Sequence, residues 1–333
     1  MRWPVQLQTD DPSPLRAFTT FLPLPTPPAP PHTMLRLGIV DFDSSHCVEF
    51  TRRINGIGVP DDQRVEGARV VLGWPGTSEM AAERIEGFRP EVEALEVELV
   101  DDPVQMIGRV DAILVLSLSG TPHLERTRPF LAAGLPVFVD KPIACRSEDA
   151  REMFRLAGEA DVPFFSGSGM RFCQEVIEFC EHRDGRYGRL HGAVSFGPAW
   201  RAEGNPGLFH YGIHPVEVLF ELMGPGCQSV TAHCGDDAEM VLGTWNDGRQ
   251  GLVRGGRAGG TAYGFTAWCE HAVIQQNIST RYSYRNLCQH IVDTLSGHSP
   301  PPVSANDTLE VVAFIEAALQ SECLDGQTVT LTS

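Results

Sequence analysis

Short apolar runs alternate with helical patterns along the chain from residue 35 onward. Helical patterns at about 45–55, 78–95 and 123–133 separate the apolar runs LRLGIV, ARVVLG, EVELV, DAILVLSL and PVFVD. Continuous apolar strands joined by crossover helices are typical of a parallel sheet that is covered on both faces. The first half therefore predicts a Rossmann-like, doubly wound α/β domain, in which ligands bind at the carboxyl ends of the strands.

The pattern changes after about residue 145. A helix over 147–160, a strand VPFFSGS and a helix near 174–182 come first. Six strand patterns then follow in succession, LHGAVSF, SVTAHC, EMVLGTW, GLVRGG, YGFTAWC and HAVIQQ, before the chain returns to helix. Strands flanked by helices predict an α+β domain with an open, mostly antiparallel sheet.

These patterns divide the chain into three parts. We predict a disordered Pro-rich tail over 1–33, a Rossmann-like domain over 34–145 and a substrate and oligomerisation domain over 146–333. A length of 333 residues suits two globular domains. Whether Met34, directly before the first strand, is the true translation start stays open.

Composition and charge narrow the class of partner. The 43 acidic residues against 26 basic ones give a net charge of -17, which repels phosphate backbones and anionic lipid. We therefore expect neither nucleic acid nor a membrane as partner, and no apolar run is long enough for a span. The nine cysteines form no C-x-x-C pair, which indicates reduced thiols, no metal site and a cytoplasmic protein.

Two segments carry candidate chemistry. In VFVDKPIA an apolar strand ends in Asp140, Lys141 and Pro142, and the proline favours extended backbone at the lysine, which presents it at the sheet edge. In GLFHYGIHPVEVLFELMG the apolar set Val216, Leu219, Phe220 and Met223 predicts a helix with one buried face.

The second segment also predicts where its histidines lie. Pro215 suits a first helical turn, so His214 stands at the helix N-terminus, where the backbone dipole favours neutral imidazole. Neutral His214 is able to accept a proton. His210, His214 and Glu217 also allow a metal reading, but zinc normally needs three or four ligands and no further cluster is visible.

Four short motifs, each weak by itself, become informative through their order and spacing along the chain. They are Thr121-Pro122-His123, Asp140-Lys141-Pro142, Arg171-Phe172 and the Gly185 to Gly188 segment before the second sheet. In this order and spacing, over residues 35–331, the chain resembles the glucose-fructose oxidoreductase, inositol dehydrogenase and MocA family. The resemblance implies an NAD or NADP cofactor and a sugar-like substrate. The open second sheet, with one face left for burial, predicts a homodimer or homotetramer.

The resemblance also implies residue roles. Lys141 and His214 match the family's catalytic lysine and histidine, and His210 stands where the family usually has an acid. Segments that line the substrate side carry Arg171, Trp200, Glu203 and Tyr263. The implied cofactor contacts are Asp41, Phe42, Asp43, Ser44, Ser45, Ser117, Ser119, His123, Asp140 and Lys141.

The sequence departs from the family at the dinucleotide turn. The family's three turn glycines are replaced by Asp41, Asp43 and His46, and two carboxylates repel a pyrophosphate unless they are protonated, turned away or bridged. Ser44 and Ser45 are candidate caps of the first helix. The usual ribose-binding acid after the second strand is also missing; Thr77 and Ser78 are candidate ribose or phosphate contacts, and Arg84 is the candidate partner of a 2′-phosphate.

The sequence therefore predicts an enzyme, an NAD(P)-dependent oxidoreductase acting on the CH–OH group of a sugar, polyol or sugar-derived substrate. His214 removes the hydroxyl proton and Lys141 stabilises the developing alkoxide. Two alternatives stay open: a sugar-binding or regulatory protein that has lost the dinucleotide, and a redox-assisted lyase or glycosidase.

Overall fold

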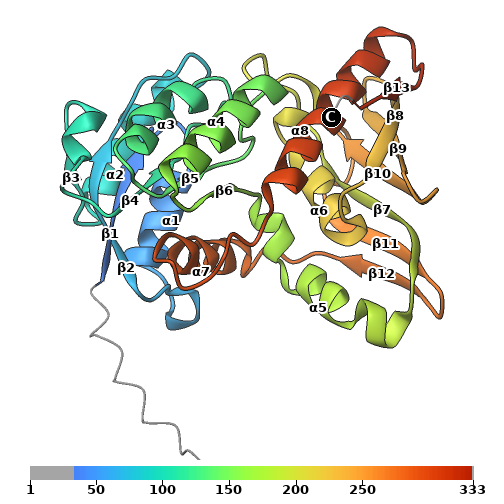
Figure 1. Cartoon of the computed structure of the whole chain (residues 1–333), viewed down its shortest axis with the longest axis horizontal. Helices are drawn as coiled ribbons and strands as arrows, with labels where there is room; N and C mark the ends of the chain where they lie inside the picture. The colour runs from blue at the N-terminus through green and yellow to red at the C-terminus, as the bar shows by residue number, and fades with distance from the viewer. Residues whose placement is uncertain (1–33, 332–333) are drawn as a thin grey trace, which may run out of the picture. The chain divides into compact units, whose positions relative to one another are not determined.

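The computed structural model describes residues 34–331 (Figure 1). The predicted tail over 1–33 lies outside the described residues. Two sheets and the helices that pack on them make up the described part of the chain. Among residues 34–331, no helix is both long enough and apolar enough to cross a bilayer.

The first sheet is parallel and has the strand order β3-β2-β1-β4-β5-β6. Its strands are β1 (Leu35–Val40), β2 (Ala68–Trp74), β3 (Glu98–Leu99), β4 (Ala112–Val115), β5 (Val137–Val139) and β6 (Phe164–Ser166). The predicted Rossmann-like sheet is confirmed. Because the strand order reverses between β1 and β4, the carboxyl ends of these two strands flank the crevice in which this fold binds ligands.

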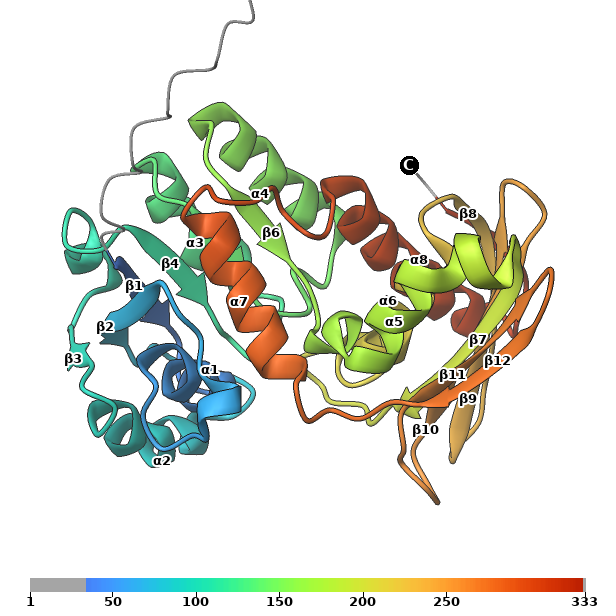
Figure 2. The ribbon, with the colours of Figure 1, turned by 90° about the horizontal axis from the view of Figure 1, so that it is seen from below.

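Crossover helices cover this sheet as the periodicity predicts. They are α1 (His46–Asn55), α2 (Ala82–Glu93), α3 (His123–Ala132) and α4 (Ser147–Ala160). Helix α7 (Ser283–Leu295) returns from near the end of the chain and packs against α1 (Figure 2). Strand β6 lies after residue 145, the predicted domain boundary, and it pairs with β5 in the first sheet. The boundary between the two domains stays a prediction.

The second sheet has seven strands in the order β12-β11-β7-β10-β9-β8-β13. They are β7 (Leu190–Pro198), β8 (Cys227–Cys234), β9 (Ala238–Trp245), β10 (Gln250–Gly256), β11 (Gly264–Cys269), β12 (Val273–Asn277) and β13 (Val329–Thr330). Every strand pair in it is antiparallel except β7 with β10. The prediction of a mostly antiparallel sheet is confirmed.

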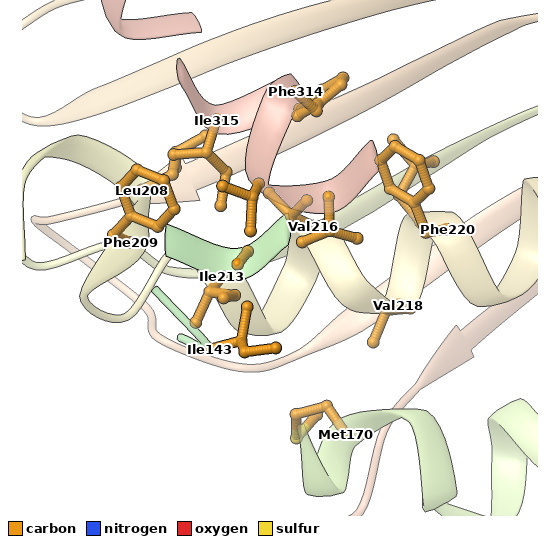
Figure 3. Packing of buried hydrophobic residues seen from close by; sticks show 14 of the residues in the cluster. Ile143, Met170, Leu208, Phe209, Ile213, Val216, Val218, Phe220, Phe314 and Ile315 are labelled. Atoms are coloured by element: carbon orange, nitrogen blue, oxygen red, sulfur yellow. The ribbon is translucent and has the colours of Figure 1, made fainter. Parts of the chain in front are cut away.

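Helices α5 (Gln174–His182), α6 (Ile213–Met223) and α8 (Ala305–Cys323) lie along one face of the second sheet (Figure 2). Figure 3 shows apolar side chains of α6 and α8 packed with Ile143 from the segment after β5. All four apolar positions predicted for α6 are buried. This packing fixes the N-terminal end of α6 next to the segment that follows β5, because Ile213 and Ile143 belong to one core cluster.

Candidate active site

Lys141 follows β5 and is the only lysine in the whole chain. Its side chain is buried, with 8% of the residue exposed, and its peptide bond to Pro142 is cis. Every other basic side chain in the Lys+Arg total of 26 is an arginine guanidinium, whereas position 141 carries a compact and flexible ammonium group. This difference points to chemistry at position 141 that a guanidinium does not supply.

Asp140, the residue before this lysine, is fully buried and pairs with a histidine from the first helix. His46 Nδ1 lies 2.5 Å from Asp140 Oδ2, and His46 Nε2 lies 3.1 Å from the Tyr284 hydroxyl on α7. Burial alone would raise the pKa of Asp140, but the charges of His46 and Lys141 and the hydrogen bond to His46 hold that pKa below its ordinary value. Asp140 is therefore an ionised anchor for His46.

His214 is the second residue of α6 and is held through its ring. Its Nδ1 lies 2.6 Å from the hydroxyl oxygen of Ser168, which also accepts a hydrogen bond from the Met170 amide. Burial lowers the pKa of His214 well below its ordinary value, and the positive charge of Lys141 lowers it further. His214 is therefore neutral at pH 7, as predicted from its place at a helix start, although burial and charge are the main causes.

His210 precedes α6 by three residues and is perturbed by the same lysine. Burial, then the charges of Lys141 and Arg84, lower its pKa to about 4. Its Nδ1 is buried and has no hydrogen-bond partner within the described residues. Two neutral imidazoles thus lie within electrostatic reach of one ammonium group.

Aromatic rings surround the two histidines. Tyr211 packs edge-on against both His210 and His214, with ring centroids 5.0 and 5.9 Å apart, respectively. Tyr263 lies 5.9 Å from His214, and Trp200 packs edge-on against Tyr211 at 4.7 Å. Tyr263 therefore lies beside His214, whereas Trp200 contacts Tyr211, the ring that packs against both histidines.

The turn between β1 and α1 carries the two carboxylates in glycine positions, and the protein itself binds both. Asp41 has a left-handed backbone, with φ of 69°, and its carboxylate accepts hydrogen bonds from the Ser117 hydroxyl and from Arg126 Nε. Asp43 accepts hydrogen bonds from the Leu118 amide at 2.9 Å and from the Ser78 hydroxyl at 2.6 Å. Burial raises the pKa of Asp41 to about 6, although Arg126 opposes the shift.

Comparison with known proteins places this arrangement in a family. Residues 74–168 match the sequence model of the oxidoreductase family with an NAD-binding Rossmann fold, GFO_IDH_MocA. The rhizopine catabolism protein MocA of Rhizobium meliloti is 28% identical over 169 residues, which cover 45% of this chain and 53% of that protein. Over these residues the chain is similar to the Gfo/Idh/MocA family of oxidoreductases. The family recognised from the order of motifs is thereby confirmed.

Further comparisons agree with the Gfo/Idh/MocA assignment. The 2,7-anhydro-N-acetylneuraminate hydratase of Mediterraneibacter gnavus is 27% identical over 245 residues, 63% of this chain and 59% of that protein. The chain thus matches little more than half the length of these two curated relatives. The structure of scyllo-inositol dehydrogenase from Lactobacillus casei with NAD(H) and scyllo-inositol superposes with a TM-score of 0.74, at 17% identity, over 90% of this chain and all of that one.

The structure shows the surroundings of three further predicted residues, and their contacts with a ligand stay predictions. His123 is fully buried, with ring nitrogens beside the Ser117 and Ile143 carbonyl oxygens, so it ties two loops together. The Phe42 ring is also fully buried and packs against Gly73, where an added Cβ would lie 2.8 Å from it. The side chain of Ser45 does not cap α1; instead the Ser44 hydroxyl accepts a hydrogen bond from the His46 amide.

Arg171, predicted to contact the substrate, is paired with two carboxylates of α6, and the substrate contact stays a prediction. Its guanidinium is buried and donates to Glu217 Oε2 at 2.5 Å and to Glu221 Oε2 at 2.7 Å, both on α6. Glu217 Oε2 also accepts a hydrogen bond from the Ser168 amide at 2.9 Å. Arg171 therefore fixes the segment that holds the His214 ring, and it acts by positioning.

The remaining predicted contacts lie around the β4–α3 loop and the segment after β7. The Ser119 hydroxyl donates to the Gly204 carbonyl oxygen at 2.8 Å, and Glu203, next to it, is exposed. Asn205, which sequence reasoning missed, is buried and bonds the Gly120 amide and the Leu118 carbonyl oxygen. In the sequence, Asn205 lies between a glycine and a proline, which is the composition of an ordinary turn and does not indicate a buried asparagine.

Two further residues of the site were also missed by sequence reasoning. His46 appeared only as a missing glycine, and its partnership with Asp140 joins residues 94 positions apart. Ser168 lies in the strand-end segment FFSGSG, where its hydroxyl looks like a turn residue. One signal was available and unused: that Lys141 is the sole lysine is visible in the sequence alone.

Proposed function

We propose that this chain is an NAD(P)-dependent oxidoreductase that acts on a CH–OH group of a sugar, polyol or sugar-derived substrate. The observation that carries the proposal is the group formed by Lys141, His210 and His214, in which the lysine charge lowers the pKa of both histidines. An ammonium group beside a neutral imidazole is what removal of a hydroxyl proton requires. The solved scyllo-inositol dehydrogenase with NAD(H) supports a polyol-like substrate.

The residues of the β1–α1 turn fit a dinucleotide despite their carboxylates. Asp41 keeps the left-handed backbone that glycine usually provides in such turns, and its charge is paired with Arg126. The Asp43 carboxylate is satisfied by Leu118 and Ser78. The Ser44 hydroxyl accepts a hydrogen bond from the His46 amide and the Ser45 side chain forms no cap, so a phosphate would approach the positive end of α1 ahead of His46. The backbone of Ser44 and Ser45 would therefore hold the pyrophosphate.

In the proposed reaction the bound nicotinamide accepts or supplies the hydride, and the chain handles the proton. His214 takes the hydroxyl proton of the substrate on Nε2, which requires that its Nδ1 carries the ring hydrogen and donates to Ser168. The Ser168 oxygen has lone pairs for both this bond and the Met170 amide. Lys141 stabilises the negative charge that develops on the substrate oxygen.

A nucleotide titration tests the proposal directly. We expect the full chain to bind a reduced nicotinamide nucleotide with a Kd in the micromolar range, on the order of 1–100 μM, measured by calorimetry and by quenching of protein fluorescence. Asp43→Asn, which keeps the size of the side chain, should bind at least as tightly, because it removes a negative charge near the pyrophosphate. If none of the four nicotinamide nucleotides binds, the chain is a non-enzymatic member of its family.

A second reaction deserves a separate assay on the same site. One relative of this chain is named a hydratase, which adds or removes water and leaves no net oxidation in its product. If this chain works in that way, Lys141 and His214 would serve a transient oxidation that is reversed before product release. The assay follows both substrate conversion and the nicotinamide absorbance: conversion without net absorbance change selects the hydratase type, and stoichiometric reduction selects the dehydrogenase.

We also propose that the uncovered face of the second sheet joins two copies of the chain. Trp268, Met240 and Val273 expose 43%, 49% and 58% of their surface. A shallow hollow of about 310 Å³, lined by Trp268 among others, runs over β7, β9, β10 and β11. Apolar patches of this kind mark interaction surfaces. We expect a dimer or tetramer by light scattering and a shift to monomer in Trp268→Glu, whereas Val104→Glu, far from this sheet in sequence and 45% exposed, changes nothing. A monomeric wild type contradicts the proposal.

A further inference from the structure

The end of β2 is where a Rossmann domain recognises the ribose of the adenosine half. An acid there favours a free 2′-hydroxyl, as in NAD, whereas an arginine accommodates the 2′-phosphate of NADP. This chain has no acid over residues 73–78, where the sequence reads GWPGTS. A group from elsewhere in the fold must therefore decide which nucleotide fits.

Arg126 occupies this place, although it is the fourth residue of α3. Its guanidinium lies over the Trp74 ring, 4.7 Å from the ring centroid. Its Nη2 donates to the Thr77 hydroxyl at 3.0 Å and lies 3.3 Å from the Thr77 carbonyl oxygen. The side chain is 22% exposed, so a ligand is able to reach it. An arginine and a hydroxyl thus stand together where an acid is missing.

The neighbouring carboxylate does not replace the missing acid. Asp41 Oδ2 is held by Arg126 Nε at 3.1 Å and by Ser117, and only 1% of the residue is exposed. The other oxygen, Oδ1, lies against Gly76, where an added Cβ would be 1.7 Å from it. A ribose hydroxyl has no path to this oxygen unless the loop moves, whereas the guanidinium is open to solvent. Asp41 therefore acts as a support that aims Arg126.

The arginine predicted for this role from the sequence lies elsewhere. Arg84 stands on α2 over the Phe88 ring, 5.3 Å from its centroid, and its charge acts on His210. Arg84 therefore packs along its own helix, and its charge reaches His210. Arg126, which no local motif marks, is the arginine at the end of β2.

We infer that this chain prefers NADP(H) to NAD(H), with Arg126 and Thr77 binding the 2′-phosphate of the nucleotide. The inference rests on the proposed dinucleotide function and adds the identity of the cofactor. A phosphate is bound well by a guanidinium whose plane is already fixed, and here Trp74 and Asp41 fix it. Little side-chain freedom is then lost when the nucleotide binds.

The experiment compares NADPH with NADH on the full chain by calorimetry. We expect wild type to bind NADPH at least about 10-fold more tightly, the range expected when hydrogen bonds to a charged group are gained. Arg126→Gln should remove this difference, and the ratio of the two Kd values is the readout, because the loss of the Asp41 partner weakens the binding of both nucleotides. Arg128→Gln is the matched control on the same helix, because Arg128 pairs with exposed Glu125 and Glu152, and it should keep the preference.

Two additions keep the result interpretable. Thr77→Val leaves the Asp41–Arg126 pair intact and should weaken NADPH binding alone, which matters if Arg126→Gln unfolds when Asp41 loses its partner. Adenosine 2′,5′-bisphosphate should compete with NADPH in wild type and fail to do so in Arg126→Gln. Equal or tighter binding of NADH by wild type overturns the inference and leaves the proposed function standing, whereas binding of neither nucleotide overturns both.

Discussion

Lys141→Ala is expected to lower kcat by about 10²- to 10³-fold while the chain stays folded, the loss seen when one stabilising group is removed from a developing oxyanion. Lys141→Arg should recover little, because a planar guanidinium does not take the place of a compact ammonium group in a buried position. The measurement is steady-state turnover with a polyol substrate, with circular dichroism as the check on folding.

The single lysine provides an independent readout of the same site. Reductive methylation modifies amines only, so Lys141 and the α-amino group are the only expected targets in the chain. Bound nucleotide and substrate should protect Lys141 from modification, as measured by mass spectrometry. Full activity of Lys141→Ala, or labelling that ligands leave unchanged, would show that this lysine is not part of the reaction.

His214 should give kcat/KM for alcohol oxidation an unusual pH profile. The group must be neutral to accept a proton, and its pKa lies well below the ordinary value of about 6.5. Lowering the pH from about 8 to 6.5 should therefore leave the His214 contribution to the rate unchanged, with the loss appearing only at more acidic pH. His214→Gln should lower kcat by about 10²- to 10⁴-fold and abolish this acidic limb.

A charge change tests why the pKa is low. Burial is the main cause, and the positive charge of Lys141 adds to it. In Lys141→Met the charge is gone, so the pKa of His214 should rise, which NMR titration of the imidazole signals would report without any need for activity. Two results would contradict the role of His214 as the base. One is a fall of kcat/KM in wild type at an ordinary histidine pKa, and the other is a His214 pKa that stays the same in Lys141→Met.

Local pattern determined much of this protein. Apolar runs and helical periods predicted most of the strands and helices in their order along the chain, because side-chain periodicity reflects which face of an element is buried. The strand that ends at Lys141 and the helix that begins next to His214 were predicted for the same reason, together with the backbone preferences of Pro142 and Pro215. These features depend on neighbours within a few residues, which a sequence displays directly.

The tertiary structure alone decided the partners of the polar groups. Asp41 is hydrogen-bonded to Arg126, 85 residues away in the sequence, and His46 to Asp140, 94 residues away. Arg171, predicted to contact the substrate, forms a buried ion pair with Glu217, 46 residues away. A buried charge must be paired, but many carboxylates and bases are available to pair with it, and sequence spacing does not rank them. The fold determines which groups pair, because it brings particular strand ends and helix starts together. The same arrangement determines which residues are able to face a ligand and which hold other side chains in place.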